Sequence, residues 1–408
     1  MTPGAGALKR VQPLAARSTT LRSVRLALGF VLMLSAARAQ NVVIVVIDGV
    51  RYTESFGGGA ATIPGIWQEL RPQGMIWEHF SNDGLTYTCP GHASIESGTW
   101  QTIFNDGSER PTFPTIFEYF RKESGLAQST CAVVAGKPKL QVLSYSSHPD
   151  YGSDYGATTH IASGDLAVFD SLRSVLAREK PRLVLVNFPG TDFAAHAGIL
   201  EEHLAALRTA DSLTDQIWKL INDDPFYAGT TTLFVTNDHG RHDDEHGGFQ
   251  AHGDSCQGCR HIMLLAVGRL VKAGLVSTTA RAQIDIATTV GWLLGFATPY
   301  AQGANLLEDP VTALLLGASA LPGAIELQAY PNPFNGSARL IYMIPKESHV
   351  QLALFDLLGR RVRTFKDGPV PAGRHTVIVD AGDLPSGIYA IRLTSGQFLA
   401  SSRMLLVK

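Results

Sequence analysis

The chain of 408 residues is long enough for two or three domains, and its formal net charge of −2 argues against general nucleic-acid binding, which leaves a basic footprint. Hydrophobic residues make up 45% of the sequence and charged residues 17%, a balance that excludes a disordered chain and allows a large buried core. Four cysteines are too few for a disulfide-rich scaffold.

The first residues have the pattern of an export signal. Lys and Arg residues up to Arg25 form a basic leader, Leu26–Ala36 is an apolar core, and Ala37-Arg38-Ala39 is a small-x-small cleavage site. The apolar core is short for a bilayer span, and an uncleaved anchor is the minor alternative. We therefore predict a mature chain that starts near Gln40 and has no transmembrane helix.

The first predicted strand runs from Asn41 to Asp48. It is a continuous run of Val and Ile, which a central parallel strand buried on both faces needs. Gly49 lets the backbone turn sharply after it. Because ligands in open α/β sheets lie just past the carboxyl ends of strands, Asp48 is a candidate site residue.

A helix is predicted to begin near Pro90, because proline suits the first turn of a helix. Thr88 or Cys89 then lies near the N-cap, where a hydroxyl faces unpaired backbone N–H groups and the positive end of the helix dipole. Thr88 either lines an anion pocket or only caps the helix. Cys89 does not fit the Cys-x-Pro-x-Arg motif of sulfatases, because Pro90 follows it directly and no Arg follows.

The middle of the chain carries ordinary α/β signals. A helix is predicted to start within Thr115–Arg121, a strand region lies within Ala132–Leu143, and Ser144–His160 has the composition of a loop or small cap. Glu201–Asn222 and Ile284–Phe296 have apolar residues at helical spacing. These elements carry no candidate ligand of high specificity.

Two more buried strands are predicted at Leu183–Val186 and Thr231–Thr236. The acidic and imidazole residues that follow them are Asp192, His196, Asp238 and His239. Alone, an Asp-His-Gly element is more often a loop that caps the next element. Here an acidic residue follows each of three strands, and two of these acids are accompanied by a histidine. This pattern instead indicates one metal site at one edge of a sheet.

The loop after the third of these strands contains further metal-binding residue types. His252 closes a charged segment, and His261–Val267 is the next apolar strand. Cys256 and Cys259 have the spacing of half a zinc site. No second pair completes it, so a local disulfide or two free thiols is favoured.

After a linker, short alternating runs punctuated by Gly and Pro predict a small all-β sandwich of roughly 80 residues. Its predicted strands lie within Ala338–Ile344, Val350–Phe355, His375–Val379, Gly387–Leu393 and Phe398–Val407. No cluster of chemistry-bearing residues lies in this part.

Seven residues of the first part can act together as three carboxylates, three imidazoles and one hydroxyl. They are Asp48, Thr88, Asp192, His196, Asp238, His239 and His252. Carboxylate and imidazole ligands suit zinc or a similar transition metal, and six of them are enough for two ions. Two metal ions can clamp an in-line displacement at phosphorus, and a metal-bound hydroxyl loses its proton readily.

These residues resemble the alkaline phosphatase superfamily, most closely its phosphodiesterase and nucleotide pyrophosphatase branch, from about Asn41 to Leu306. The matching elements are Asp48-Gly49, Thr88-Cys89-Pro90-Gly91-His92, the Asp-x-x-x-His pair Asp192 and His196, Asp238-His239-Gly240, and His252. Cys89 and Gly91 depart from the Thr-Phe-Pro-Asn-His form of the second element, which puts nucleotide preference in doubt.

The resemblance implies two divalent metal ions, expected to be zinc, and Thr88 as the nucleophile. One ion would be held by Asp192, His196 and His252, and the other by Asp48, Asp238, His239 and the Thr88 oxygen. Asn105 stands where the family keeps an asparagine that hydrogen-bonds a phosphoryl oxygen. Candidate anion-binding cations, which the sequence does not place, are Arg110, Lys137 and Arg241.

The last stretch, about Glu326 to Lys408, resembles the C-terminal sorting domain of the type IX secretion system. The resemblance is carried by Tyr330-Pro331-Asn332-Pro333-Phe334-Asn335, Leu354-Phe355-Asp356-Leu357-Leu358-Gly359-Arg360, Ala372-Gly373-Arg374-His375 and Ser386-Gly387-Ile388-Tyr389. It implies contact with that secretion machinery and a secreted or cell-surface location. The alternative is an ordinary β module for packing or adhesion.

The expected fold is therefore an α/β, alkaline phosphatase-like α/β/α sandwich with a mostly parallel central sheet, followed by a small Ig-like β-sandwich. The expected domains are a signal peptide (1–39), a hydrolase domain (40–306), a linker (307–325) and a sorting domain (326–408). The expected function is hydrolysis of small-molecule phosphoric esters through a phospho-threonine at Thr88. The alternatives are a sulfuric-ester hydrolase on the same fold and a non-catalytic surface binding protein.

Overall fold

The computed structural model describes residue 1, residues 41–309, and residues 326–408 apart from 331, 333, 345–346, 357–358, 372 and 396–397. The predicted signal peptide beyond its first residue, and the predicted linker from residue 310 on, lie outside the described residues. Among the described residues, no helix has both the length and the apolar character needed to cross a membrane.

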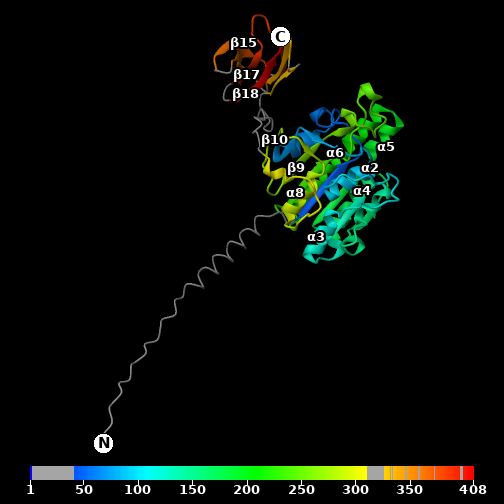
Figure 1. Cartoon of the computed structure of the whole chain (residues 1–408). Coiled ribbons are helices and arrows are strands. Elements are labelled where there is room, and N and C mark those ends of the chain that lie inside the picture. Colours follow the sequence, from blue (N-terminus) through cyan, green and yellow to red (C-terminus); the bar gives the residue numbers. More distant parts are fainter. Residues whose placement is uncertain are drawn as a thin grey trace. The chain divides into compact units, whose positions relative to one another are not determined.

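An eight-stranded sheet forms the centre of residues 41–309 (Figure 1). In spatial order its strands are β10 (Leu275–Ser277), β2 (Gly74–Trp77), β9 (Leu264–Gly268), β7 (Thr231–Thr236), β1 (Asn41–Ile47), β6 (Leu183–Phe188), β4 (Cys131–Ala135) and β5 (Thr158–Ile161). The strands from β7 to β5 are all parallel, and β9 is antiparallel to both β7 and β2. The sheet is therefore mostly parallel, which confirms the predicted fold class.

Strand β1 lies inside the sheet because its sequence can be buried on both faces. All of its residues are buried, and it pairs with β6 on one side and β7 on the other. Its side chains alternate between two core clusters, with Val42, Ile44 and Val46 in one and Val43, Val45 and Ile47 in the other. Burial of each such side chain stabilises the fold by about 1.5–3 kcal/mol. The strand that leads to Asp48 is thus held from both faces.

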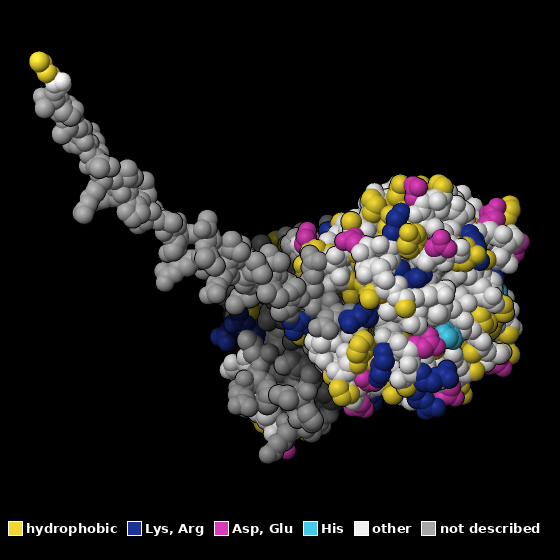
Figure 2. Space-filling model, turned by 90° about the horizontal axis from the view of Figure 1, so that it is seen from below, with side chains coloured by type: hydrophobic (Ala, Val, Ile, Leu, Met, Phe, Trp, Pro, Cys, Tyr) yellow, Lys and Arg dark blue, Asp and Glu magenta, His cyan; other side chains and the backbone are white. Residues whose placement is uncertain are grey.

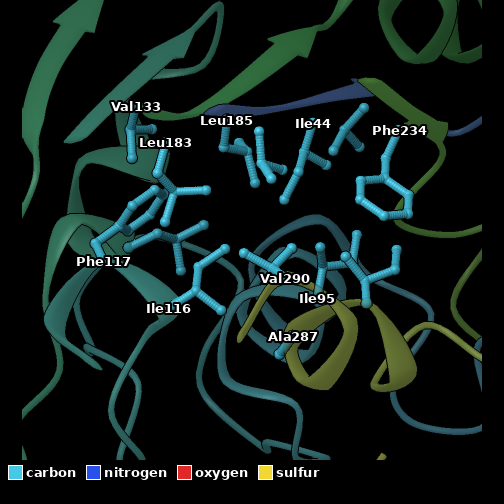
Figure 3. Packing of buried hydrophobic residues seen from close by; sticks show 14 of the residues in the cluster. Ile44, Ile95, Ile116, Phe117, Val133, Leu183, Leu185, Phe234, Ala287 and Val290 are labelled. Carbon is cyan, nitrogen blue, oxygen red and sulfur yellow. The ribbon is translucent and has the colours of Figure 1, made fainter. Parts of the chain in front are cut away.

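Helices cover both faces of the sheet. On one face lie α2 (Thr88–Ser97), α3 (Ile116–Ser124) and α8 (Asp285–Leu294), whose apolar side chains meet those of the strands in Figure 3. On the other face lie α4 (Asp165–Arg178) and α6 (Leu200–Asp223). Two shorter helices are α5 (Gly190–Ala197) and α7 (Gln257–Arg260). The arrangement is the predicted α/β/α sandwich.

Two predicted strands are shorter than their apolar runs. The region Ala132–Leu143 contains only β4, because Pro138 has no N–H to donate to a sheet and residues 138–144 form a 3₁₀ helix. The run His261–Val267 is divided between β9 and a separate small sheet. That sheet consists of β11 (Arg281–Ala282), β3 (Phe80–Ser81) and β8 (His261–Ile262).

Residues 326–408 form two antiparallel sheets. The first contains β12 (Glu326–Tyr330), β13 (Ser337–Ile344) and β16 (Gly373–Asp380), and the second contains β15 (Arg361–Val370), β14 (Ser348–Phe355), β17 (Gly387–Ser395) and β18 (Phe398–Leu406). One buried cluster includes Leu340 of the first sheet and Ile391 of the second, so the two sheets pack together as a small sandwich. β12 and β15 are additions to the predicted strands.

The surface carries acidic and basic side chains in close alternation. On the face shown in Figure 2, Lys and Arg groups lie beside Asp and Glu groups, and hydrophobic side chains are scattered between them. Such mixing is expected of a chain whose 34 Lys and Arg residues nearly balance its 36 Asp and Glu residues. Charges of mixed sign over the described part of this face give little long-range steering of a charged partner.

Glu96 of α2 predicts a pH-dependent stability. Both of its carboxylate oxygens are buried without a hydrogen-bond partner, and burial, followed by Glu118, raises the pKa of Glu96 well above its usual value. A group whose pKa is raised in the folded state contributes most to stability at pH values below its pKa in the unfolded chain. That contribution is lost as the pH rises through the folded-state pKa. We expect Glu96→Gln to have a higher Tm than the parent at alkaline pH, with the difference shrinking toward about pH 4.

Thermal unfolding of both proteins across this pH range measures the effect. The matched control is Glu202→Gln, which changes an exposed glutamate on α6 and should leave the pH profile unchanged. A Tm difference for Glu96→Gln that is constant with pH would contradict the prediction.

Candidate active site

Three neighbouring parallel strands bring the candidate residues to one edge of the sheet. β1 ends directly before Asp48, β6 leads into α5, which carries Asp192, and β7 ends just before Asp238 and His239. Because β7, β1 and β6 are adjacent and parallel, their carboxyl ends lie on the same side. All four side chains are buried. The cluster thus forms at the edge that the strand pattern predicts.

Asp192, His196 and His252 form the first group of candidate metal ligands. The two histidine Nε2 atoms are 3.3 Å apart, and Asp192 Oδ1 lies 3.4 Å from Nε2 of His196 and 3.7 Å from Nε2 of His252. Zinc bonds of about 2.0–2.1 Å in a tetrahedron put two ligand atoms about 3.3 Å apart. The three atoms have the spacing of one face of such a tetrahedron, so this group fits a divalent metal.

Backbone carbonyl groups determine which nitrogen of two imidazoles is free. Nδ1 of His252 lies 2.9 Å from the Thr86 carbonyl oxygen, and Nδ1 of His239 lies 2.8 Å from that of Gly240. A carbonyl oxygen only accepts, so each Nδ1 carries the proton and each Nε2 keeps a lone pair for a metal. Burial lowers the pKa of His252 well below its usual value, which keeps its imidazole neutral as a ligand must be.

The second predicted ligand set contains buried acceptor atoms without partners. Asp238 Oδ2 and His239 Nε2 are buried, have no hydrogen bond and lie 3.5 Å apart, and Asp48 Oδ1 is 3.7 Å from His239 Nε2. Buried polar atoms are normally paired, and a cation would satisfy both of these acceptors. The donor chemistry of Asp48, Asp238 and His239 therefore also fits a divalent metal.

This second set is less regular than the first. Asp48 groups closely with Asp192 and His239, and separately with His92 and Asp238. His92 Nδ1 lies 3.2 Å from Asp238 Oδ2, but its hydrogen bond goes to the Thr88 carbonyl oxygen at 2.9 Å. Asp48 therefore bridges two groups of candidate ligands, and His92 is a neighbour for which the sequence analysis had no role.

Lys137 lies at the centre of the cluster. Its Nζ is 2.9 Å from Asp48 Oδ1, 2.7 Å from Asp192 Oδ2 and 3.2 Å from Thr88 Oγ1. Burial alone would lower the pKa of Lys137, but Asp48 and Asp192 raise it above its usual value, so the side chain is an ammonium ion. It links both ligand groups to the threonine hydroxyl.

Arg241 is the second cation of the cluster, whereas Arg110 lies elsewhere. Arg241 NH1 lies 2.9 Å from Asp192 Oδ1. Arg110 stacks on Tyr145 and donates to a backbone carbonyl. Three buried carboxylates therefore face two fixed cations, a formal charge of −3 + 2 = −1 with neutral histidines. A buried negative balance of this kind favours an added cation.

The carboxyl groups of the cluster respond differently to this environment. Burial, and then the charge of Asp238, raises the pKa of Asp48, against the opposing effect of Lys137. Burial would also raise the pKa of Asp192, but the hydrogen bond from His196 and the charge of Lys137 hold it well below its usual value. An additional positive charge beside Asp48 would therefore favour its carboxylate form.

Thr88 is the first residue of α2 and does not act as its cap. The N-cap is Tyr87, which makes no side-chain capping bond, and the Thr88 hydroxyl instead lies beside the Lys137 ammonium. The neighbouring Cys89 is part of the apolar core, where burial raises the pKa of its thiol to about 11. Of the two reactive side chains at this helix start, the hydroxyl is therefore the one that faces the polar cluster.

Asn105 and Gly91 complete the surroundings of the helix start. Asn105 Oδ1 accepts from the Cys89 N–H at 2.9 Å and from Lys139 Nζ at 3.0 Å. A Cβ on Gly91 would lie 2.5 Å from the Asp238 carbonyl oxygen, so glycine permits the close approach of α2 to the loop after β7. The predicted residues Thr88 and Asn105 thus lie at the same helix terminus.

Lys137, like Arg241, is a residue of this cluster whose place is not given by the sequence. It follows β4 in Gly136-Lys137-Pro138, and β4 is the neighbour of β6 in the sheet. The rule that placed the acids, a residue just past the carboxyl end of a parallel strand, applies equally to this lysine. The missing information was the strand order, which puts β4 next to β6.

Comparison with known proteins identifies two parts of the chain. Residues 91–263 match the family model of the metalloenzyme superfamily, and residues 328–408 match that of the secretion system C-terminal sorting domain. A search of curated proteins found no match. The chain therefore contains a metalloenzyme-superfamily domain, which implies binding of divalent metal, followed by a type IX sorting domain, which indicates a secreted or cell-surface protein.

Solved structures share the fold of much of the chain. An alkaline phosphatase superfamily protein from Vibrio parahaemolyticus is 14% identical with a TM-score of 0.50, and the alignment covers 76% of each chain. The 2-O GAG sulfatase BT1596 is 13% identical with a TM-score of 0.52, over 84% of this chain and 85% of the sulfatase. The fold is thus alkaline phosphatase-like.

Proposed function

We propose that the protein is a secreted, metal-dependent hydrolase of small-molecule phosphoric esters that uses Thr88 as its nucleophile. The observation that carries the proposal is the Thr88 hydroxyl at the start of α2, which contacts the buried Lys137 ammonium within the cluster of Asp and His side chains. Every candidate ligand position holds a competent residue, which disfavours a non-catalytic binding protein.

In this proposal Asp192, His196 and His252 hold one divalent ion, expected to be zinc. The second ion is held by Asp48, Asp238, His239 and the Thr88 oxygen. Bound metal supplies Lewis acidity that neutralises phosphoryl oxygens and lowers the pKa of a bound hydroxyl.

The protein's own side chains then attack the substrate and stabilise its charge. The Thr88 oxygen loses its proton, attacks phosphorus in line and forms a phospho-threonine while the P–O bond to the alcohol breaks and that oxygen gains a proton. Water then cleaves the phospho-threonine and restores the hydroxyl. The Lys137 ammonium places a positive charge next to the attacking oxygen. Asn105 donates a hydrogen bond to a phosphoryl oxygen at the helix terminus.

A sulfuric-ester hydrolase is the nearest alternative, because the fold is shared with a sulfatase. The burial of the Cys89 side chain in the apolar core disfavours it, since a sulfatase-type cysteine must face the reacting group. The proposed domain limits are residues 40–306 for the hydrolase and 326–408 for the sorting domain that engages the secretion machinery.

Assays of the purified mature protein with added zinc distinguish these functions. We expect turnover of an aryl phosphate monoester or diester that exceeds turnover of the matched aryl sulfate. A preference for the sulfate would favour the alternative enzyme. Inactivity on all three substrates, together with an absence of bound metal, would favour a binding protein.

Removal of metal is expected to abolish turnover and lower stability. The cluster has a formal charge of −1 without metal. A metal ion that binds only to the folded protein stabilises the folded state by mass action. We expect dialysis against a chelator to eliminate activity and reduce Tm, and zinc to restore both. Full activity in protein shown by elemental analysis to be free of metal would contradict the prediction.

A further inference from the structure

A second cluster of metal-binding side chains lies on the loop after β7. Its members are His242, Asp254, Cys256 and Cys259. Their candidate ligand atoms all lie within 4.8 Å of one another, and none of the four belongs to the site described above. Both cysteines are free thiols.

The distances within this cluster match those of a tetrahedral zinc site. His242 Nδ1 lies 3.6 Å from Cys256 Sγ, 3.7 Å from Cys259 Sγ and 3.1 Å from Asp254 Oδ2. Tetrahedral zinc with bonds of about 2.3 Å to sulfur and about 2.0–2.1 Å to nitrogen puts the sulfur and nitrogen atoms about 3.5 Å apart. The histidine nitrogen is therefore placed almost as it would be with the metal bound.

The backbone holds the two halves of the cluster together. Arg241 N–H donates to the Gly258 carbonyl at 3.1 Å, and Gly240 N–H donates to that of Cys259 at 2.8 Å. A Cβ on Gly258 would lie 2.4 Å from the Arg241 carbonyl oxygen, so only glycine allows this approach. The Cys-x-x-Cys turn is thus bonded against the segment that leads into His242.

Neighbouring groups orient the Asp254 ligand toward His242. Asp254 Oδ1 accepts from the Cys256 N–H at 2.9 Å, which leaves Oδ2 directed toward His242. Supporting bonds of this kind orient the ligands of protein zinc sites. Cys259 is buried and Asp254 is exposed. One side of the site is therefore enclosed by protein, and the other is open to solvent.

We propose that His242, Asp254, Cys256 and Cys259 bind a structural zinc ion. The Cys-x-x-Cys pair is completed by a histidine and an aspartate rather than by a second cysteine pair, which is why sequence spacing alone favours a disulfide or free thiols. Two thiolates with an imidazole and a carboxylate suit zinc better than magnesium or calcium, which prefer oxygen ligands.

The proposed zinc ion has a consequence for the candidate active site. His242 N–H donates to the Ala251 carbonyl at 2.9 Å, next to His252, and the Asp254 carbonyl accepts from the Thr86 hydroxyl at 2.8 Å. Zinc at the second cluster therefore fixes both ends of the segment that carries His252. The inference does not depend on the reaction proposed for Thr88.

Cobalt substitution tests the proposal with a signal specific to this site. Thiolate bound to Co²⁺ gives an intense near-ultraviolet charge-transfer band, and the candidate active site contributes no cysteine ligand. We expect full-length mature protein loaded with Co²⁺ to show this band, and the Cys256→Ser/Cys259→Ser variant to lack it. The variant should also contain one equivalent of zinc less by elemental analysis. Cys131→Ala, which changes a buried free cysteine elsewhere, is the control and should retain both.

A milder variant keeps the test meaningful if the double variant does not fold. Asp254→Asn removes the charge of the exposed ligand, and it should bind zinc at this site at least about 10-fold more weakly in competition with a chelator, because even loss of a supporting bond costs that much; the thiolate band should be retained. A mass lower by two hydrogens, indicating a Cys256–Cys259 disulfide in the isolated protein, would overturn the proposal. So would metal-loaded parent protein without a thiolate band.

Discussion

Replacement of Thr88 by alanine is expected to reduce kcat at least about 10³-fold on any phosphoric ester that the protein hydrolyses. The reason is that Thr88 supplies the only reactive oxygen at the start of α2 that faces the Asp and His cluster among the described residues, whereas Cys89 is buried in the apolar core. Steady-state kinetics and elemental analysis measure the effect. The variant should retain its metal, because its Asp and His ligands are unchanged.

The conservative variant Thr88→Ser serves as the control. It keeps a hydroxyl at the same position and should retain measurable turnover, together with a covalent phospho-enzyme that is detectable after rapid acid quenching. Full activity of Thr88→Ala would refute the nucleophile assignment, whichever ester is the substrate. Loss of bound metal in Thr88→Ala would instead show that the threonine oxygen is needed to hold the second ion.

The fold and the location of the cluster could be predicted because their signals are local. A run of Val and Ile that stops at Asp48 predicts a buried strand with an acidic residue at its carboxyl end. The start of α3 was also readable, because Thr115 and Glu118 form a capping box within four residues. The apolar run after Cys131 predicts a longer strand than the structure has, because Pro138 starts a 3₁₀ helix and cannot donate to the sheet.

The remaining features depend on contacts between residues far apart in the chain. Lys137 reaches Asp192 only because β4 and β6 are neighbours, and no local pattern states that order. His242 completes the cysteine pair because the backbone of Gly258 packs against it, 16 residues further on. Sequence spacing identifies candidate ligands, but the sheet order and close backbone approaches decide which of them meet.

Replacement of Lys137 by methionine is expected to affect both turnover and stability. The ammonium contacts the Thr88 oxygen and balances Asp48 and Asp192, so its loss removes positive charge at the reacting atom. We expect kcat to fall about 10²–10³-fold with a smaller change in KM, as for removal of one stabilising donor. Without metal, the variant leaves buried carboxylates uncompensated and should lose about 3–5 kcal/mol of stability.

The two effects separate when metal is added. Bound divalent ions supply positive charge to the same carboxylates, so zinc should recover most of the lost stability of Lys137→Met but not its kcat. The matched control is Lys139→Met, two residues on, whose ammonium contacts Asn105 rather than the carboxylates and whose loss should leave the metal-free Tm nearly unchanged. If zinc restored the kcat of Lys137→Met along with its Tm, the lysine would act only through the stability of the cluster, and the charge beside Thr88 would have to come from metal alone.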